Sequence, residues 1–109
     1  MSQLLDEFNA TLKALNDETP DQLAGFMGFM KAAKADGAIP GKAKNLILVA
    51  LAVANQCDWC IAVHVANAIK TGATAEEILE AAWLAVLMGG GPKLTYMKIV
   101  RDEIAANTK

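Results

Sequence analysis

The chain is short, rich in apolar residues and almost neutral, and these features limit what it can be. Its 109 residues fit a single domain spanning 1–109, because domains most often contain about 100 to 150 residues. The formal charge of -2 with scattered lysines and arginines argues against a nucleic-acid partner, and the longest apolar run, residues 46–54, is about half of the roughly 20 residues that a membrane span needs.

The first predicted element is an amphipathic helix over residues 2–16. Its apolar residues recur at helical spacing, and they are Leu4, Leu5, Phe8, Leu12 and Leu15. Asp6 and Glu7 stand where a signal peptide needs basic residues, and no long apolar stretch follows them. We therefore expect the protein to be cytoplasmic.

Two further helices are predicted before the centre of the chain. Thr19 and Pro20 provide a cap and a first-turn proline for a helix that runs to about residue 35. The glycines and proline of residues 36–42 predict a loop. Residues 42–54 then form an almost uninterrupted apolar run, whose length and alanine content favour a buried helix over a strand.

Three more helices are predicted in the second half. One opens at Cys57 and is closed by Gly72. Thr74 with Glu77 three positions later predicts a capping box and a helix to residue 88, which residues 89–91 terminate. Pro92 begins a last helix that ends near residue 106. Six helices with no strand alternation predict an all-α fold.

The apolar content also predicts a homo-oligomer. Apolar residues make up 54% of the chain, above the roughly 45 to 50% of soluble proteins, and a short chain buries a smaller fraction of its surface. One apolar stripe at helical spacing is interpreted as core or subunit contact, and it consists of Trp83, Leu84, Leu87 and Met88. A second group covers both sides of its helix and is expected to be buried against a neighbour, and it consists of Phe26, Met27, Phe29 and Met30.

The chemistry of the chain centres on Cys57, Cys60 and His64. Positions i, i+3 and i+7 of a helix fall on one face, so the two thiols and the only imidazole are expected to lie together. Backbone N–H groups in a first helical turn favour a thiolate, and a nearby imidazole can take its proton. A thiolate of this kind can attack a peroxide oxygen and then be resolved by its neighbour as a disulfide.

Plainer readings of the same residues compete with this one. Cysteine is often a small buried hydrophobic residue, and a single histidine on an apolar helix face is more often structural than catalytic. Zinc binding ranks lower, because one and a half turns supply three ligands and leave the fourth to Asp58 or another subunit. The joint occurrence of the three residues in register favours the redox interpretation.

A known family shares this pattern. The stretch NQCDWCIAVHVANAIKTGATAEEILEAAWLAVLMGGGP resembles the alkylhydroperoxidase D-like, carboxymuconolactone decarboxylase family, in which Cys-x-x-Cys-x-x-x-His precedes Gly-Ala-Thr, Glu-Glu-Ile and a glycine run. The resemblance covers about residues 42–104. It implies an all-α fold, trimers or hexamers, and, where the cysteines are kept, a thiol-dependent peroxidase that a lipoyl-type dithiol recharges.

The resemblance also assigns roles to residues. It makes Cys57 and Cys60 the redox pair and places His64 in a proton relay. Cys60 matches the cysteine that attacks first in the family, whereas Cys57, nearer the helix start, gains more from the helix dipole, so the order of the two thiols stays open. The relay glutamate of the family falls at Asn45 in this chain, and an amide cannot accept a proton as a carboxylate does. This departure argues against fast peroxidase turnover and leaves dithiol chemistry open.

The sequence thus predicts a homo-oligomeric thiol peroxidase that reduces a hydroperoxide. It uses Cys57, Cys60 and His64, needs no cofactor or metal, and depends on a lipoyl-type or thioredoxin-like dithiol donor that the sequence does not identify. Two alternatives are a lyase acting on a carboxylated lactone, as the family name implies, and a non-enzymatic redox-sensing scaffold. The lyase ranks lower because its chemistry does not use a cysteine pair.

Overall fold

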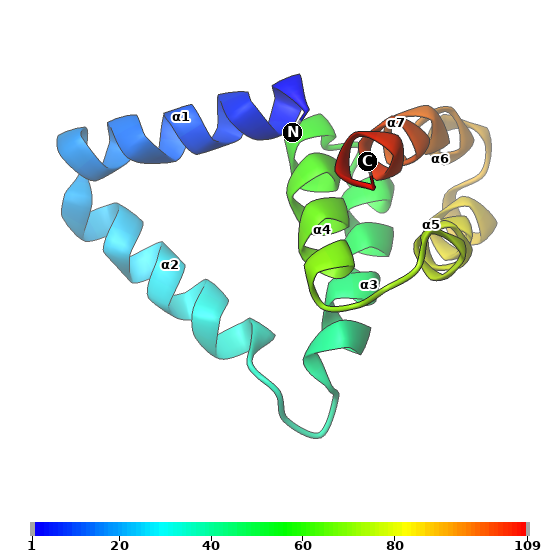
Figure 1. Cartoon of the computed structure of the whole chain (residues 1–109), viewed down its shortest axis with the longest axis horizontal. Helices are drawn as coiled ribbons and strands as arrows, with labels where there is room; N and C mark the ends of the chain where they lie inside the picture. The colour runs from blue at the N-terminus through cyan, green and yellow to red at the C-terminus, as the bar shows by residue number, and fades with distance from the viewer. Residues whose placement is uncertain (1, 109) are drawn as a thin grey trace.

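The computed structural model describes residues 2–108 and is all-α, as predicted (Figure 1). Within this range the chain forms seven helices: α1 (Gln3–Glu18), α2 (Pro20–Lys34), α3 (Gly41–Ala54), α4 (Asp58–Lys70), α5 (Ala75–Gly89), α6 (Gly91–Thr95) and α7 (Met97–Asn107). The last helix predicted from the sequence is divided at Tyr96 into α6 and α7, since Pro92 starts a short turn that does not continue into α7.

Helices α3 to α7 form a bundle around one apolar core. Helix α3 packs against both α4 and α5, and α7 covers α4. The largest side chains of this core are completely buried, and they are Val49, Val53, Ile61, Val65, Ile78 and Val100. Burying one such side chain is worth about 1.5 to 3 kcal/mol, so the bundle contains the main source of stability.

Helices α1 and α2 form an arm beside the bundle. Figure 1 shows them as a V whose open side faces α4. Only Leu5 of α1 is buried, where it packs on Ala62 and Ala66 of α4, and α2 has no buried residue. The start of α1 is also tied to α7, because the Ser2 hydroxyl donates a hydrogen bond to the buried carboxylate of Glu103.

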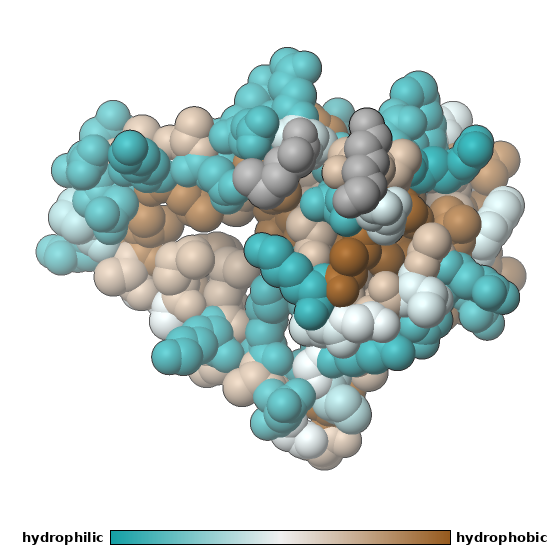
Figure 2. All heavy atoms as spheres, viewed as in Figure 1, coloured by the Kyte–Doolittle hydropathy of each residue, from teal (hydrophilic) through white to brown (hydrophobic). Residues whose placement is uncertain are grey.

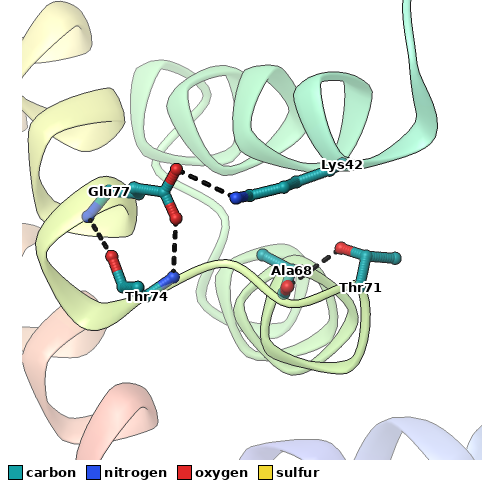
Figure 3. A network of polar contacts seen from close by, with 5 residues as sticks. All are labelled: Lys42, Ala68, Thr71, Thr74 and Glu77. Atoms are coloured by element: carbon teal, nitrogen blue, oxygen red, sulfur yellow. Dashed lines mark hydrogen bonds and ion pairs between the residues drawn. The ribbon is translucent and has the colours of Figure 1, made fainter.

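The start of α5 is fixed by a network of polar contacts (Figure 3). The predicted capping box is present: the Glu77 backbone N–H donates to the Thr74 hydroxyl at 3.1 Å, and the Thr74 N–H donates to the Glu77 carboxylate at 2.9 Å. Lys42 of α3 pairs with the same carboxylate at 3.1 Å. The hydrogen bond from the Thr74 backbone and then the contact with Lys42 lower the pKa of Glu77.

The apolar groups on α2 and α5 are not part of the core. Trp83, Leu84, Leu87 and Met88 are 52 to 88% exposed, and Phe29 is 68% exposed. The stripe on α5 is therefore not core in the single chain, and burial of either group against another subunit stays a prediction. No helix within residues 2–108 has the length and apolarity that crossing a membrane requires.

Candidate functional site

Cys57 and Cys60 lie at a tight connection between α3 and α4. Only three residues join the two helices, and Gln56 among them adopts a left-handed backbone with φ of 51°. The backbone N–H of Cys57 donates to the carbonyl of Ala52 at 3.2 Å. This turn reverses the chain, so that α4 packs against α3. The hydrogen bond from Cys57 to Ala52 fixes the start of α4 at the buried C-terminal end of α3.

Cys57 and Cys60 are joined in a disulfide, with their Cα atoms 5.2 Å apart. The sequence predicted that Cys57 lies in the first turn of its helix. In the structure α4 begins at Asp58, so Cys57 is the N-cap of α4 instead. Its sulfur accepts a hydrogen bond from the Cys60 N–H at 3.2 Å. Cys60 is exposed and Cys57 is half-buried, so a reagent from solvent reaches Cys60 more easily.

His64 lies one turn further along α4. Its side chain is half-buried, and its Nδ1 atom is buried without a hydrogen-bond partner in residues 2–108. Burial lowers the pKa of His64, and the positive charge of Lys34 at the end of α2 lowers it further. The imidazole is therefore neutral at physiological pH, which is the form that accepts a proton.

Asn45 occupies a buried position on the facing helix α3 and is 6% exposed. Its Nδ2 donates to the Thr71 hydroxyl at 3.4 Å, at the end of α4 furthest from the cysteines. Its Oδ1 is buried and has no partner in the described residues, and no hydrogen bond joins Asn45 to His64. The amide is thus held by the C-terminal end of α4, and its role toward His64 stays a prediction.

Two contacts at this site were not predicted from the sequence. The indole Nε1 of Trp59, between the cysteines, donates to the Glu7 carboxylate of α1 at 3.1 Å. The positive charge of Lys34, at the end of α2, lowers the pKa of His64. Both interactions join residues far apart in the chain, and no local pattern marks Glu7 or Lys34 as part of a site. Among residues 2–108, no group of three His, Cys, Asp or Glu side chains lies close enough to hold a metal ion.

Comparison with known proteins decides the family. The model of the carboxymuconolactone decarboxylase family matches residues 20–102, which include the whole site. The chain belongs to the carboxymuconolactone decarboxylase family. This confirms the resemblance that the cysteine motif and the glycine run had indicated.

Two relatives share much of this sequence. An uncharacterized protein of Cupriavidus necator is 41% identical over 92 residues, which cover 84% of this chain and 81% of that protein. An uncharacterized protein of the cox locus of Paracoccus denitrificans is 47% identical over 82 residues, covering 72% and 74% of the two chains.

Solved structures of family members share the fold. The apo form of a carboxymuconolactone decarboxylase family protein from Legionella pneumophila has a TM-score of 0.93 and 39% identity, covering 97% of this chain and 95% of that one. A Thermotoga maritima family protein, described with a suggested role in the antioxidative response, has a TM-score of 0.82 and 21% identity, covering 96% and 89%.

Proposed function

We propose that this family member is a thiol-dependent peroxidase that uses Cys57 and Cys60 as its redox pair and His64 as the proton carrier. The observation that carries the proposal is the disulfide between the two cysteines, with the His64 imidazole one turn away on the same helix. A structural disulfide would need neither an exposed sulfur nor a nearby base.

The catalytic cycle begins with the reduced pair. The Cys60 thiolate attacks the outer oxygen of a hydroperoxide, the O–O bond breaks, and the alkoxide leaves as an alcohol after it takes a proton. Cys60 is now a sulfenic acid. The Cys57 sulfur attacks the Cys60 sulfur, the disulfide forms, and the hydroxyl leaves as water. His64 takes the thiol proton and returns it to the leaving oxygen.

The cycle closes when two electrons and two protons reduce the disulfide. An external dithiol of the lipoyl or thioredoxin type supplies them and becomes oxidised in turn. The exposure of Cys60 favours it as the sulfur that the donor attacks. We further propose that the protein works in the cytoplasm as a trimer or hexamer, in which the exposed apolar residues of α5 lie between subunits.

The first test is alkylation of the reduced protein, followed by mass spectrometry, before and after one equivalent of hydroperoxide. We expect rapid loss of both thiols, a linked Cys57–Cys60 peptide, and a thiol pKa well below about 8.5. Cys60→Ser should abolish peroxide consumption and His64→Ala should weaken it, whereas Lys70→Ala, an exposed change on the same helix, serves as the matched control. Slow thiol loss with an ordinary pKa would refute the proposal.

Asn45 provides a second test of the relay. Asn45→Glu places an acid at the position to which the resemblance assigns the relay glutamate of the family, and Asn45→Gln is the matched control without the charge. We expect turnover to rise only in the glutamate variant. Equal rates in both would contradict a relay through position 45. The activity of a lyase would be unchanged in Cys60→Ser and in Cys57→Ser, and a redox-sensing scaffold would show no turnover.

A further inference from the structure

One face of α2 is apolar at its start and positively charged at its end. Its residues recur at helical spacing, and they are Leu23, Met27, Met30 and Lys34. The first three line a hollow of about 330 Å³ between α1 and α2, and a hollow of about 430 Å³ continues from it to Lys31 and Lys34. Figure 2 shows apolar side chains gathered along the inner sides of both helices. We call these four residues the α2 face.

One face of α5 has the opposite order and the opposite charge. Its residues are all exposed and lie on one side of the helix, and they are Glu76, Glu80, Trp83 and Leu87. Trp83 is 52% and Leu87 is 78% exposed. Neither glutamate makes an ion pair within residues 2–108, and the same is true of Lys31 and Lys34. These four residues of α5 are called the α5 face, which is negatively charged at its start and apolar at its end.

A groove beside the α5 face extends its apolar surface. The groove has a volume of about 340 Å³ and lies between α3 and α5, where the exposed Ile47, Leu51 and Leu84 line it. A neighbouring hollow of about 310 Å³ shares Leu84 with the groove and is lined also by Glu77 and Glu80. The groove is thus apolar with carboxylates at one end, as the α5 face is. A large exposed apolar patch of this kind is typical of an interaction site.

The two faces match when α2 and α5 run antiparallel. Each face spans about 16 Å at the rise of an α-helix, and each has the same spacing between its four positions. A single register therefore aligns all of them: Leu23 with Leu87, Met27 with Trp83, Met30 with Glu80, and Lys34 with Glu76. In this register Lys31 lies beside Glu80, so apolar residues meet apolar residues and both carboxylates meet an ammonium group.

The pairing joins two copies of the chain. Figure 1 shows α2 and α5 on opposite sides of α3 and α4, so the two faces of one chain do not meet. We propose that α2 of one copy packs antiparallel on α5 of a second copy, with its lysines paired to Glu76 and Glu80 of that copy. This deepens the subunit contact proposed above by naming both of its helices, and it rests on that oligomer but not on the peroxidase.

Charge favours this partner over the other ways to cover the same surfaces. Two α5 helices would place Glu76 on Glu76 if parallel and on Leu87 if antiparallel, which leaves the carboxylates unpaired. Two α2 helices fail in the same way, with Lys34 on Lys34 or on Leu23. A small amphiphile could pair with the lysines but would leave the α5 face exposed. Packing of α2 on α5 covers both apolar surfaces and pairs the charges of both.

Charge reversal tests the contact in the intact protein. Lys31→Glu/Lys34→Glu and Glu76→Lys/Glu80→Lys each place like charges opposite one another. Each should therefore raise the dissociation constant of the assembly at least about tenfold in analytical ultracentrifugation. The chain with all four changes should regain its assembly, because opposite charges face each other again.

Matched variants separate the contact from general effects of charge and apolarity. Lys13→Glu/Lys70→Glu changes the net charge as much as the lysine reversal does, at exposed positions outside both faces, and should leave the assembly unchanged. Met27→Gln should weaken the assembly, because Met27 lies opposite Trp83. Phe29→Gln should not, because Phe29 is 68% exposed and lies on the other side of α2.

Cross-linking of the unaltered protein identifies the paired residues directly. A zero-length carbodiimide reagent should join Lys34 to Glu76, and Lys31 to Glu80, between isotope-labelled and unlabelled copies. An assembly that is cross-linked elsewhere and resists charge reversal would overturn this contact and leave the oligomer standing.

Other outcomes assign the failure to one proposal or the other. A monomer that consumes hydroperoxide would overturn the contact and the oligomer but not the peroxidase. A monomer that binds dodecanoate, and loses it in Lys31→Gln/Lys34→Gln, would overturn the contact and assign the α2 face to a small amphiphile. The expected cross-links without any consumption of hydroperoxide would support the contact and refute the peroxidase.

Discussion

The bundle and the arm have similar helices but opposite packing. In the bundle, residues such as Val53, Ile61 and Ile78 are completely buried, and every long helix contributes to one core. In the arm, Leu5 is the one buried residue of α1, and α2 has none. The arm is as helical as the bundle, so helix formation and burial are separate outcomes of this sequence.

The difference shows that the arm is held in position by a few polar contacts and not by burial. Its apolar side chains do not stabilise the single chain by burial, yet its position is fixed at three points: Ser2 with Glu103, Glu7 with Trp59, and Lys44 with the end of α2. A segment that is held in position but not packed leaves its inner surface available. The bundle supplies stability and contains the cysteine pair, and the apolar side chains of the arm stay accessible in the single chain.

The largest expected effect separates the two regions directly. Ile78→Ala, in the bundle core, should lower the free energy of unfolding by about 2 to 5 kcal/mol because it leaves a cavity. Phe29→Ala, on the exposed side of α2, should change it by less than about 0.5 kcal/mol. Urea unfolding of both variants measures this. A large loss for Phe29→Ala would mean that a partner covers the arm in solution.

A smaller effect compares two helix caps. Thr74→Ala removes a hydroxyl that accepts from the Glu77 N–H, so it should cost about 1 kcal/mol and lower Tm. Thr19 is also an N-cap, of α2, but its side chain makes no cap hydrogen bond. Thr19→Ala is the matched control and should cost clearly less in the same thermal unfolding series. Equal losses would show that the capping box adds nothing.

The hydrogen bond between Trp59 of the bundle and Glu7 of the arm predicts a still smaller change in the free energy of unfolding. Glu7→Gln keeps the shape of the side chain but weakens the hydrogen bond from the Trp59 indole, which should cost about 0.5 kcal/mol. In a Trp83→Phe background, the emission of Trp59 alone should shift. Glu18→Gln, an exposed change at the other end of α1, should leave the emission unchanged. An unchanged emission spectrum in Glu7→Gln would contradict a hydrogen bond between Trp59 and Glu7 in solution.

The smallest effect at neutral pH is expected from His64, and it grows in acid. The lowered pKa of His64 means that the unfolded chain takes up a proton below about pH 6.5 while the folded chain resists it, so stability falls as the pH drops through this range. His64→Asn should flatten that fall between about pH 7.5 and about pH 5.5. Lys34→Gln, which removes the second cause of the shift, should flatten it in part. A wild-type stability that does not change with pH over this range would refute the account.

The sequence predicted most of the local structure. The capping box at Thr74, the apolar helix of residues 42–54 and the cysteine pair at the start of α4 all follow from neighbours within a few residues, and the structure contains each of them. The family follows from the same local motif, because the cysteines, the histidine and the glycine run occur at fixed spacings along one stretch of chain.

What the sequence missed depends on contacts between distant residues. Helical periodicity shows that Trp83 and Leu87 share a face but does not show what covers it, so the sequence could not decide between core and subunit contact. Cys57 is the N-cap because the left-handed turn at Gln56 delays the start of α4 to Asp58. Lys34 acts on His64, and Glu7 accepts from Trp59, only because the arm folds back toward α4. A pattern read along the chain carries no information on such pairs.

The contact between Ser2 and Glu103 also sets an order of events during protein synthesis. The ribosome releases α1 first, but the residues that hold it in place, Ala62, Ala66 and Glu103, are made much later. Helix α1 therefore has no partner until α4 supplies Ala62 and Ala66, and its contact with Glu103 forms only after α7 has emerged. The contacts of the arm are thus completed by the last helix of the bundle.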